Sequence, residues 1–309
     1  MTRHLETPAD FIVPLDMNGL KGRMLLMPAK NRKDLDILFI YGHHSSLERW
    51  WGLVKHLSRY GSVTMPDLPG FGGMESFYRL GKKPSVDNLA DYLAAFMKMH
   101  FKRKNVVVVG LSFGFVVVTR MLQRYPELTK NIKLIVSLAG FTHADDFVFT
   151  KRRRLIYKFS AELMSYNLTA FAFRYICLNK PFLRLYYQQV NQPNGPSSRK
   201  SNLNDRTIQT AAEIWLWQHN DLRTHASTSA EFLSLDNCRK FIELPVWNVI
   251  ADTDPYFDYQ RVAQHMSIVF TDVRTVKSKL RSHAPSLVAN EQEAAELVPP
   301  QLRRTLRQL

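Results

Sequence analysis

The chain has 309 residues, of which 45% are hydrophobic, enough to bury the core of one α/β domain that carries an insertion. Its formal net charge of +15 favours contact with anionic surfaces, but no zinc-finger spacing, heptad-linked basic region or RNA-binding aromatic motif accompanies the basic residues, so nucleic acid is not an expected partner. The first residues do not resemble a secretory signal, and no apolar run reaches about 18 residues, so we expect a cytoplasmic protein without a membrane span. Cys177 and Cys238 lack a metal-binding spacing, so we expect no bound metal.

Strand-like and helix-like segments alternate through the first half of the chain. Residues 11–16 and 22–30 predict an opening antiparallel hairpin, because Asn18-Gly19 between them is a turn sequence. Further strands are expected at 36–42, 62–67, 105–110 and 132–140, and helices at 46–61, 85–100 and 113–125. Because these strands are almost uninterrupted apolar runs, they predict a parallel sheet covered by helices on both faces.

The alternation stops after Gly140 and resumes only at residues 244–252. The segment between them is rich in aromatic residues and too long for a plain loop. We therefore expect a core formed by residues 1–140 and 241–309, with residues 141–240 inserted as a helical cap over one edge of the sheet.

Near its end the chain returns to the sheet. Residues 273–279 predict a last strand, and a helical pattern runs from about 285 to 308.

The sequence Gly-Leu-Ser-Phe-Gly at residues 110–114 lies directly between an expected strand and an expected helix. In that setting a Gly-x-Ser-x-Gly motif exposes the serine hydroxyl on a sharp turn above the sheet, and the two glycines keep Cβ atoms out of the bend. Ser112 is therefore the candidate nucleophile.

Four segments together resemble the α/β-hydrolase superfamily. They are the turn at 110–114, the Asp-Leu-Pro-Gly-Phe-Gly loop at 67–72, an acid turn at 250–258, and a histidine turn with its helix at 281–298. The resemblance implies an eight-stranded, mostly parallel α/β sheet with helices on both faces, a helical cap over the site, and no cofactor.

A serine hydroxyl needs a base to remove its proton and a third group to orient that base. The family's chain order of serine, acid and histidine implies Ser112, Asp254 and His283. Asp252 and Asp258 remain alternatives for the acid, since they lie in the same turn. A carboxylate of this turn that is not catalytic is expected to cap a helix.

Two backbone N–H groups should stabilise the oxyanion that forms when serine attacks a carbonyl. The resemblance implies that Phe113, directly after the nucleophile, and His43, in the loop after the third strand, supply them. Tyr41 stands where the family commonly has histidine, and the neighbouring His44 has no assigned role. The histidines expected to be surface or structural residues include His219, His225 and His265.

A serine nucleophile argues against the epoxide hydrolases and haloalkane dehalogenases that the chain otherwise resembles, because they need a carboxylate at that position. We expect hydrolysis of a carboxylic ester, and the aromatic cap favours a lipid-like or monoacylglycerol-type acyl group. Carbon–carbon bond hydrolysis, another acyl transfer, and a non-catalytic binding role remain alternatives, because fold and triad do not separate them.

The cap is basic as well as aromatic. Glu162 is its only acid between residues 151 and 200, and Lys151–Arg154 form a basic run. This composition is typical of peripheral contact with an anionic membrane surface, and it equally suits a soluble substrate that carries a carboxylate. The expected partners are therefore a small acyl ester and an anionic membrane.

Overall fold

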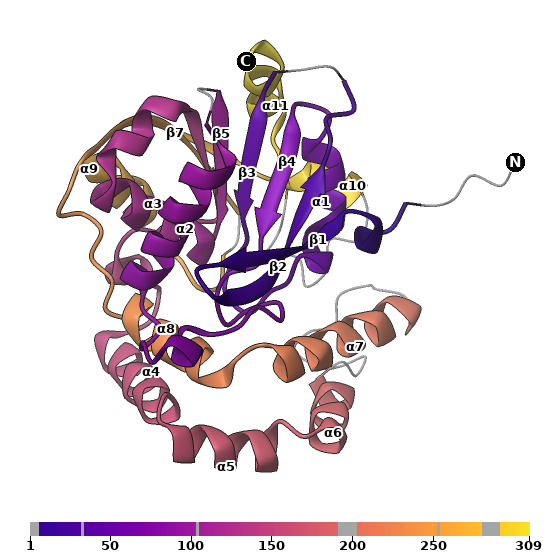
Figure 1. The fold of residues 1–309 in the computed structure, drawn as a ribbon. Helices are drawn as coiled ribbons and strands as arrows, with labels where there is room; N and C mark the ends of the chain where they lie inside the picture. The colour runs from indigo at the N-terminus through magenta and orange to yellow at the C-terminus, as the bar shows by residue number, and fades with distance from the viewer. Residues whose placement is uncertain (1–5, 32–33, 103–104, 191–202, 252–253, 280–290) are drawn as a thin grey trace, which may run out of the picture.

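The computed structural model describes residues 6–31, 34–102, 105–190, 203–251, 254–279 and 291–309. They form an eight-stranded sheet in the order β1-β2-β4-β3-β5-β6-β7-β8 (Figure 1). Its strands are β1 (Ile12–Met17), β2 (Leu20–Met27), β3 (Asp36–Ile40), β4 (Ser62–Pro66), β5 (Val106–Leu111), β6 (Ile132–Leu138), β7 (Ile242–Ile250) and β8 (Phe270–Lys277). The pairs β1–β2 and β2–β4 are antiparallel and all other pairs are parallel. The predicted eight-stranded, mostly parallel sheet is confirmed.

The opening hairpin forms where the sequence predicts it. Asn18 and Gly19 both have positive φ angles, 54° and 84°, and Met17 pairs with Leu20 across the turn. A two-residue turn of this kind needs left-handed backbone at both positions to match the twist of the strands, which is why an Asn-Gly sequence suits it.

Helices cover both faces of the sheet. They are α1 (Trp51–Leu57), α2 (Val86–His100), α3 (Phe113–Arg124), α9 (Tyr259–Val269), α10 (Glu291–Leu297) and α11 (Pro300–Gln308). Figure 1 shows α2, α3 and α9 on one face, and α1 and α10 on the other. The hydroxyl of Ser85 accepts a hydrogen bond from the N–H of Asn88 at 3.0 Å, so it caps α2 as predicted.

Two helix predictions differ from the structure in their bounds. The helix expected at 46–61 is a 3₁₀ turn, Glu48–Trp50, followed by α1, which ends at Leu57. The pattern from about 285 to 308 forms two helices in its described part, because Pro299 has no N–H to continue α10 and Pro300 takes the first position of α11.

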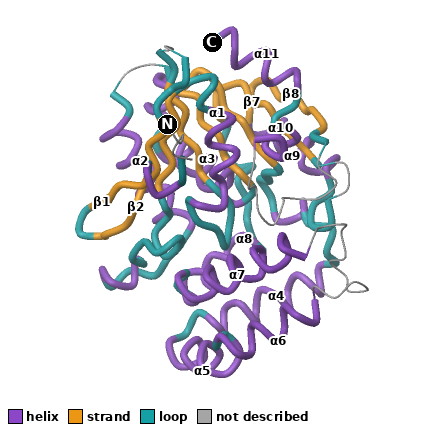
Figure 2. Tube along the Cα trace, turned by 90° about the vertical axis from the view of Figure 1, so that its right-hand side faces the viewer, coloured by secondary structure: helices purple, strands orange, loops and turns teal. Residues whose placement is uncertain are grey.

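Between β6 and β7 the chain forms an insertion of helices, here called the cap. Its helices are α4 (Lys151–Met164), α5 (Asn167–Cys177), α6 (Lys180–Val190), α7 (Leu203–His219) and α8 (Leu222–Phe232). Figures 1 and 2 both place α7 and α8 between the sheet and the outer helices α4 to α6. The exact residue bounds of core and cap, 141–240 for the cap, stay a prediction.

The cap has a small apolar core of its own. Ala170, Leu178, Leu183 and Leu222 form it, apart from the large cluster on both sides of the sheet. None of the helices in the described ranges is long and apolar enough to cross a membrane.

Candidate active site

Ser112 occupies a strained turn between a buried strand and a helix. β5 ends at Leu111, α3 begins at Phe113, and Ser112 between them has φ 49° and ψ −118°. Its N–H donates to the carbonyl oxygen of Leu138 on β6 at 2.9 Å, and its carbonyl oxygen accepts from the N–H of Phe115 at 3.0 Å. Non-glycine residues rarely adopt positive φ, and such strain is found at functional sites where the surroundings enforce it.

The two glycines beside Ser112 leave room for this turn. A Cβ atom at Gly110 would lie 2.6 Å from the Cα of Phe115, and one at Gly114 would lie 2.3 Å from the carbonyl oxygen of Ile40. Both distances are too short for any side chain. The structure therefore gives the two glycines the steric role expected from the sequence.

Ser112 lines a cavity of about 580 Å³ at the carboxyl ends of the parallel strands. The loops after β3, β6 and β7 and the cap supply the rest of its walls. Its aromatic lining consists of Trp50, Phe113, Phe141, Phe147, Phe149, Tyr157, Phe232, Tyr256 and Phe257. Phe257 stacks on Phe141 with ring centroids 4.5 Å apart. Such walls suit an apolar ligand group.

The loop after β3 lies directly against this turn. A Cβ atom at Gly42 would be 3.3 Å from the Cβ of Ser112, and His43 and Phe113 line the same cavity as Ser112. The N–H of Phe113 belongs to the first turn of α3, where N–H groups have no partner inside the helix. The structure thus brings together three of the residues named from the sequence.

Tyr41 fixes this loop from beneath. Its hydroxyl donates to Oδ1 of Asp67 at 2.8 Å and accepts from the N–H of Leu68 at 3.0 Å. Arg23 donates through Nε to Oδ2 of Asp67 at 3.1 Å. Burial raises the pKa of the Asp67 carboxyl to about 8, although Arg23 and the Tyr41 hydroxyl act in the opposite direction. The tyrosine at the position of the family's usual histidine is therefore hydrogen-bonded.

Three histidines meet where the loop after β3 touches α8. The ring centroid of His225 lies 4.2 Å from that of His43 and 5.2 Å from that of His44, and Nε2 of His43 is 2.9 Å from Oγ1 of Thr228. Burial lowers the pKa of all three imidazoles, in the case of His225 to about 4. His225 is half-buried rather than exposed on the surface of the cap, and the three rings are neutral at pH 7.

His44 joins the loop to the cap. Its backbone is left-handed, with φ 53°, and its carbonyl oxygen accepts from Nη1 of Arg49 at 3.3 Å. The side-chain amide of Asn220 lies 3.2 Å from its Nδ1, and a carboxylate oxygen of Glu213 lies 3.7 Å from its Nε2. The sequence left His44 without a role, and the structure shows it bracing the loop against α7 and the residues that follow it.

Asp254 begins the turn after β7. Its Oδ1 accepts from the N–H groups of Tyr256 at 2.8 Å and Phe257 at 3.2 Å. Phe257 lines both the Ser112 cavity and a small pocket that Asp254 lines, so the acid turn adjoins the cavity. The proposed base, His283, lies outside the described residues.

Of the two alternative acids, Asp252 and Asp258, the structure describes Asp258 alone. Asp258 caps α9, since its Oδ1 accepts from the N–H groups of Gln260 at 3.0 Å and Arg261 at 3.3 Å. This is the helix-capping role expected of a carboxylate in this turn that is not catalytic. Asp252 lies outside the described residues.

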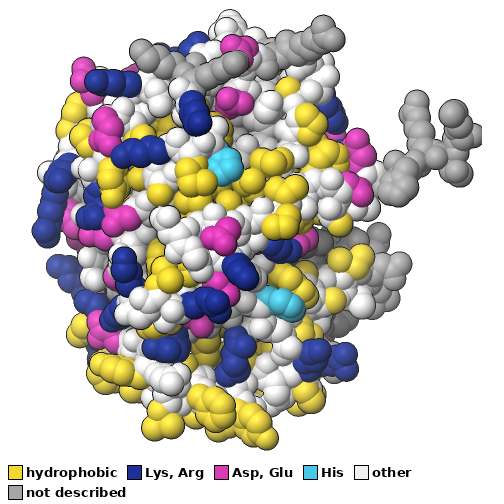
Figure 3. All heavy atoms as spheres, in the orientation of Figure 1, with side chains coloured by type: hydrophobic (Ala, Val, Ile, Leu, Met, Phe, Trp, Pro, Cys, Tyr) yellow, Lys and Arg dark blue, Asp and Glu magenta, His cyan; other side chains and the backbone are white. Residues whose placement is uncertain are grey.

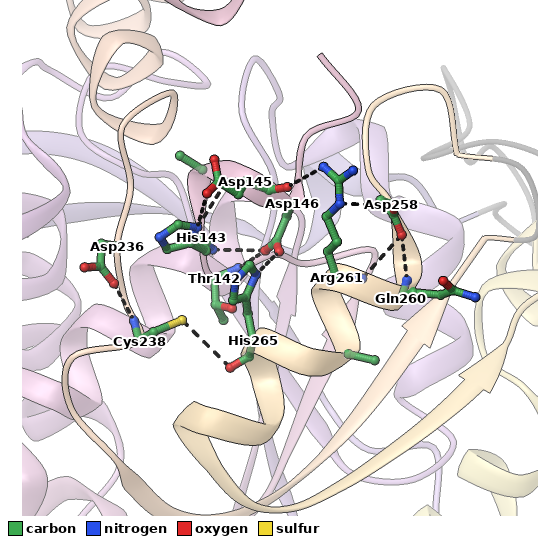
Figure 4. Close-up of polar contacts among 12 residues, drawn as sticks. Thr142, His143, Asp145, Asp146, Asp236, Cys238, Asp258, Gln260, Arg261 and His265 are labelled. Atoms are coloured by element: carbon green, nitrogen blue, oxygen red, sulfur yellow. Dashed lines mark hydrogen bonds and ion pairs between the residues drawn. The ribbon is translucent and has the colours of Figure 1, made fainter. Parts of the chain in front are cut away.

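An acid–histidine pair fixes the loop after β6 (Figure 4). The buried carboxylate of Asp146 accepts from the N–H groups of Thr142 at 2.9 Å and His143 at 3.0 Å, and its Oδ1 lies 2.5 Å from Nδ1 of His265 on α9. His265 lines a separate hollow that Ser112 does not line. No sequence pattern indicates this pair, because its members lie 119 positions apart and no motif joins them.

The remaining histidine named from the sequence is on the surface. His219 ends α7, exposed, with its ring stacked on Trp215 at 4.0 Å. Among the described residues, no group of three or more His, Cys, Asp or Glu side chains could hold a metal ion.

Comparison with known proteins agrees with this architecture. The family model for the alpha/beta hydrolase fold matches residues 37–286. A search of curated protein sequences finds no significant match. Similar solved structures include a bromoperoxidase from Bacillus anthracis, with 13% identity and a TM-score of 0.63, covering 93% of this chain and 94% of that one. A thermophilic esterase from Thermogutta terrifontis has 12% identity and a TM-score of 0.61, covering 96% and 98%. A hydrolase from Oleispira antarctica has 12% identity and a TM-score of 0.64, covering 93% and 94%.

Proposed function

The chain belongs to the alpha/beta hydrolase fold family, and from this premise we propose that it is a serine hydrolase that cleaves a carboxylic ester. The observation that supports this best is the position of Ser112, which is held at φ 49° between β5 and α3 on the wall of an aromatic cavity. A side chain in such a strained turn faces the substrate with little freedom to turn away.

The proposed reaction proceeds through an acyl-enzyme. Oγ of Ser112 attacks the ester carbonyl carbon while His283 takes the hydroxyl proton, and Asp254 holds the imidazole in the required tautomer. The N–H groups of His43 and Phe113 stabilise the oxyanion. His283 then protonates the departing alcohol, and a water molecule activated by the same imidazole releases the acid and restores Ser112.

The proposed substrate has an apolar acyl group. Phe141, Phe147 and Phe257 pack against one another along one wall of the cavity, and Phe232 of α8 extends this wall into the cap. Aromatic surface of this kind favours a hydrocarbon chain over a sugar or a charged peptide. A lipid-like or monoacylglycerol-type ester fits it best.

A fluorophosphonate probe tests the nucleophile. We expect covalent labelling of the parent protein, loss of labelling in Ser112→Ala, and retained labelling in Ser229→Ala, because Ser229 is a second serine that lines the same cavity, from the cap. Hydrolysis of p-nitrophenyl esters of increasing chain length then measures acyl preference. Failure of the folded parent to react with the probe or any ester would favour the non-catalytic binding role.

Three amide substitutions test the acid. Asp254→Asn should reduce turnover by several orders of magnitude without unfolding the chain, because an amide cannot hold the base in its working tautomer. Asp258→Asn should affect mainly the start of α9, which Asp258 caps. If Asp252→Asn proved the most damaging of the three, the acid would be Asp252 instead.

A further inference from the structure

The outer helices of the cap carry apolar side chains that are exposed in the part of the chain that the structure describes. Leu155 and Phe159 of α4, Leu168, Phe171 and Tyr175 of α5, and Leu185 of α6 are each 57% to 79% exposed. We call these residues the apolar cap face. Within α4 and α5 they recur three or four residues apart, so in each helix they share one side.

The opposite side of these helices is already packed. Ala170 and Leu183 belong to the buried core of the cap, and Met164 packs against it. A helix of a water-soluble domain normally places polar residues on the side away from its core. Exposed apolar residues on three consecutive helices therefore indicate a contact surface.

Basic residues surround the apolar cap face. Residues 151–187 include Arg152, Lys180 and Arg184 among their eight Lys and Arg residues, and Glu162 is their only acid. Figure 3 shows apolar side chains along the lower edge of the molecule, where the cap lies, with Lys and Arg side chains directly above them. The charge of this surface complements an anionic partner.

The same charge argues against self-association through this face. Pairing of two copies would bring two strongly positive surfaces together around the apolar contact, which Coulomb repulsion disfavours. A bilayer with anionic lipids instead provides an apolar region in which Leu and Phe side chains can be buried. Its headgroup interface is a favourable location for Tyr, Lys and Arg side chains.

We propose that the apolar cap face docks on an anionic lipid membrane. Its Leu and Phe side chains enter the headgroup region, and the basic side chains around them contact lipid phosphates and carboxylates. α4 also contributes Tyr157 and Ala161 to the lining of the Ser112 cavity. Docking therefore brings one wall of that cavity close to the lipid surface.

Two residues of the basic run at 151–154 have contacts within the cap and take no part in the proposed membrane contact. Arg154 is hydrogen-bonded to the carboxylate of Asp145 at 2.6 Å, and Nε of Arg153 donates to the hydroxyl of Tyr157 at 2.7 Å. These two arginines hold the start of α4. The apolar side chains, with Arg152 and the basic residues farther along the outer helices, supply the docking surface.

Vesicle co-sedimentation tests the proposal. The parent should bind vesicles that contain phosphatidylserine, bind neutral phosphatidylcholine vesicles more weakly, and lose affinity at high salt. The variant Phe159→Asn/Leu168→Asn/Phe171→Asn should bind at least about tenfold more weakly, since it removes three exposed apolar side chains that docking would bury in the bilayer. The matched variant Met99→Asn/Phe241→Asn/Ile268→Asn changes three side chains that are 53% to 60% exposed outside the cap, and it should bind like the parent.

A charge variant provides a second readout. Arg152→Gln/Lys180→Gln/Arg184→Gln changes only exposed side chains, so folding should be unaffected, and its binding to phosphatidylserine vesicles at low salt should fall. Ser112→Ala should bind vesicles like the parent, so docking and catalysis can fail separately. Absence of vesicle binding by the parent, or equal binding by the parent and the apolar cap variant, would overturn the proposal. A dimer that the apolar substitutions dissociate, without vesicle binding, would identify a second copy as the partner instead.

Discussion

The hydroxyl group of Tyr41 supports the loop that carries His43. That hydroxyl joins Asp67 and the N–H of Leu68 in the buried interior. Tyr41→Phe removes this hydroxyl from Oδ1 of Asp67 and from the N–H of Leu68, so we expect the free energy of unfolding to fall by about 1–3 kcal/mol. Urea denaturation measures this change. Tyr166→Phe, at a ring that is 67% exposed, is the control and should have no effect, and an equal effect of both substitutions would contradict the role given to Tyr41.

Asp67 makes the stability of the chain depend on pH. Burial raises its pKa from 3.8 to about 8 in the folded state. Between these two values the folded carboxyl is protonated while the unfolded one is ionised. The free energy of unfolding should therefore fall as pH rises from about 4 to about 8, by about 1.4 kcal/mol per pH unit for this group.

Asp67→Asn isolates this contribution. The amide has nearly the same shape but does not titrate, so the stability of the parent relative to the variant should decrease steadily with rising pH. Denaturation curves between about pH 5 and about pH 8 test it. If the difference in stability between parent and variant stayed constant over this range, Asp67 would have the same protonation state in the folded and the unfolded chain.

At the scale of single residues, the sequence predicted what a local motif encodes. Gly110, Ser112 and Gly114 lie within five residues of one another, so their steric relation could be derived before the fold was known. The bond between Tyr41 and Asp67 joins residues 26 positions apart, and the Asp146–His265 contact spans 119 positions. Such contacts depend on how separate elements pack, which no local pattern records.

The junction of the loop after β3 with α8 should be sensitive to acid. His43, His44 and His225 meet there, and burial together with mutual repulsion lowers the pKa of His43 and His44 below the ordinary value of 6.5. The pKa of His225 falls from 6.5 to about 4. Because the folded state keeps these imidazoles neutral, their contribution to the free energy of unfolding is fully present above pH 6.5. This contribution is lost as the pH falls towards the lowered pKa values of the folded state.

Replacement of His225 should make the protein less sensitive to acid. Its shift corresponds to about 3 kcal/mol, so His225→Gln should lose less stability than the parent between about pH 6.5 and about pH 4. His219→Gln, at the exposed end of α7, is the control and should behave like the parent. Thermal unfolding across this pH range measures the effect, and parallel pH profiles for all three proteins would contradict it.

The elements of the sheet were more predictable than those of the cap. Buried strands such as β5 are continuous apolar runs, and the Asn18-Gly19 turn fixes the hairpin by its backbone preference. The ends of the helices were harder to predict. α1 ends at Leu57, four residues before the glycine expected to end it, and the C-terminal pattern is divided into α10 and α11 at Pro299. The length and aromatic content of the cap predicted that it would be helical, but they did not predict which of its residues lie on a covered side and which on an exposed side.

Across the whole molecule, packing is concentrated around the sheet. The core cluster of the sheet includes strands, flanking helices and loops, whereas Ala170, Leu178, Leu183 and Leu222 make up the separate buried cluster of the cap. α3 buries most of its side chains, including Phe115, Val116 and Val118. In α5, a helix of similar length, Ala170 is the only side chain that is fully enclosed in the described structure.

This difference predicts separate opening of the outer cap. Amide hydrogens exchange through local opening, whose free energy is small where few apolar contacts are lost. We therefore expect the amides of α5 to exchange with solvent far faster than those of α3, in a hydrogen-exchange experiment read by mass spectrometry on the intact fold. α3 is the internal control for helix length. If α5 were protected as strongly as α3 in free solution, an additional contact would have to cover it, and the apolar cap face would already be occupied before any membrane is added.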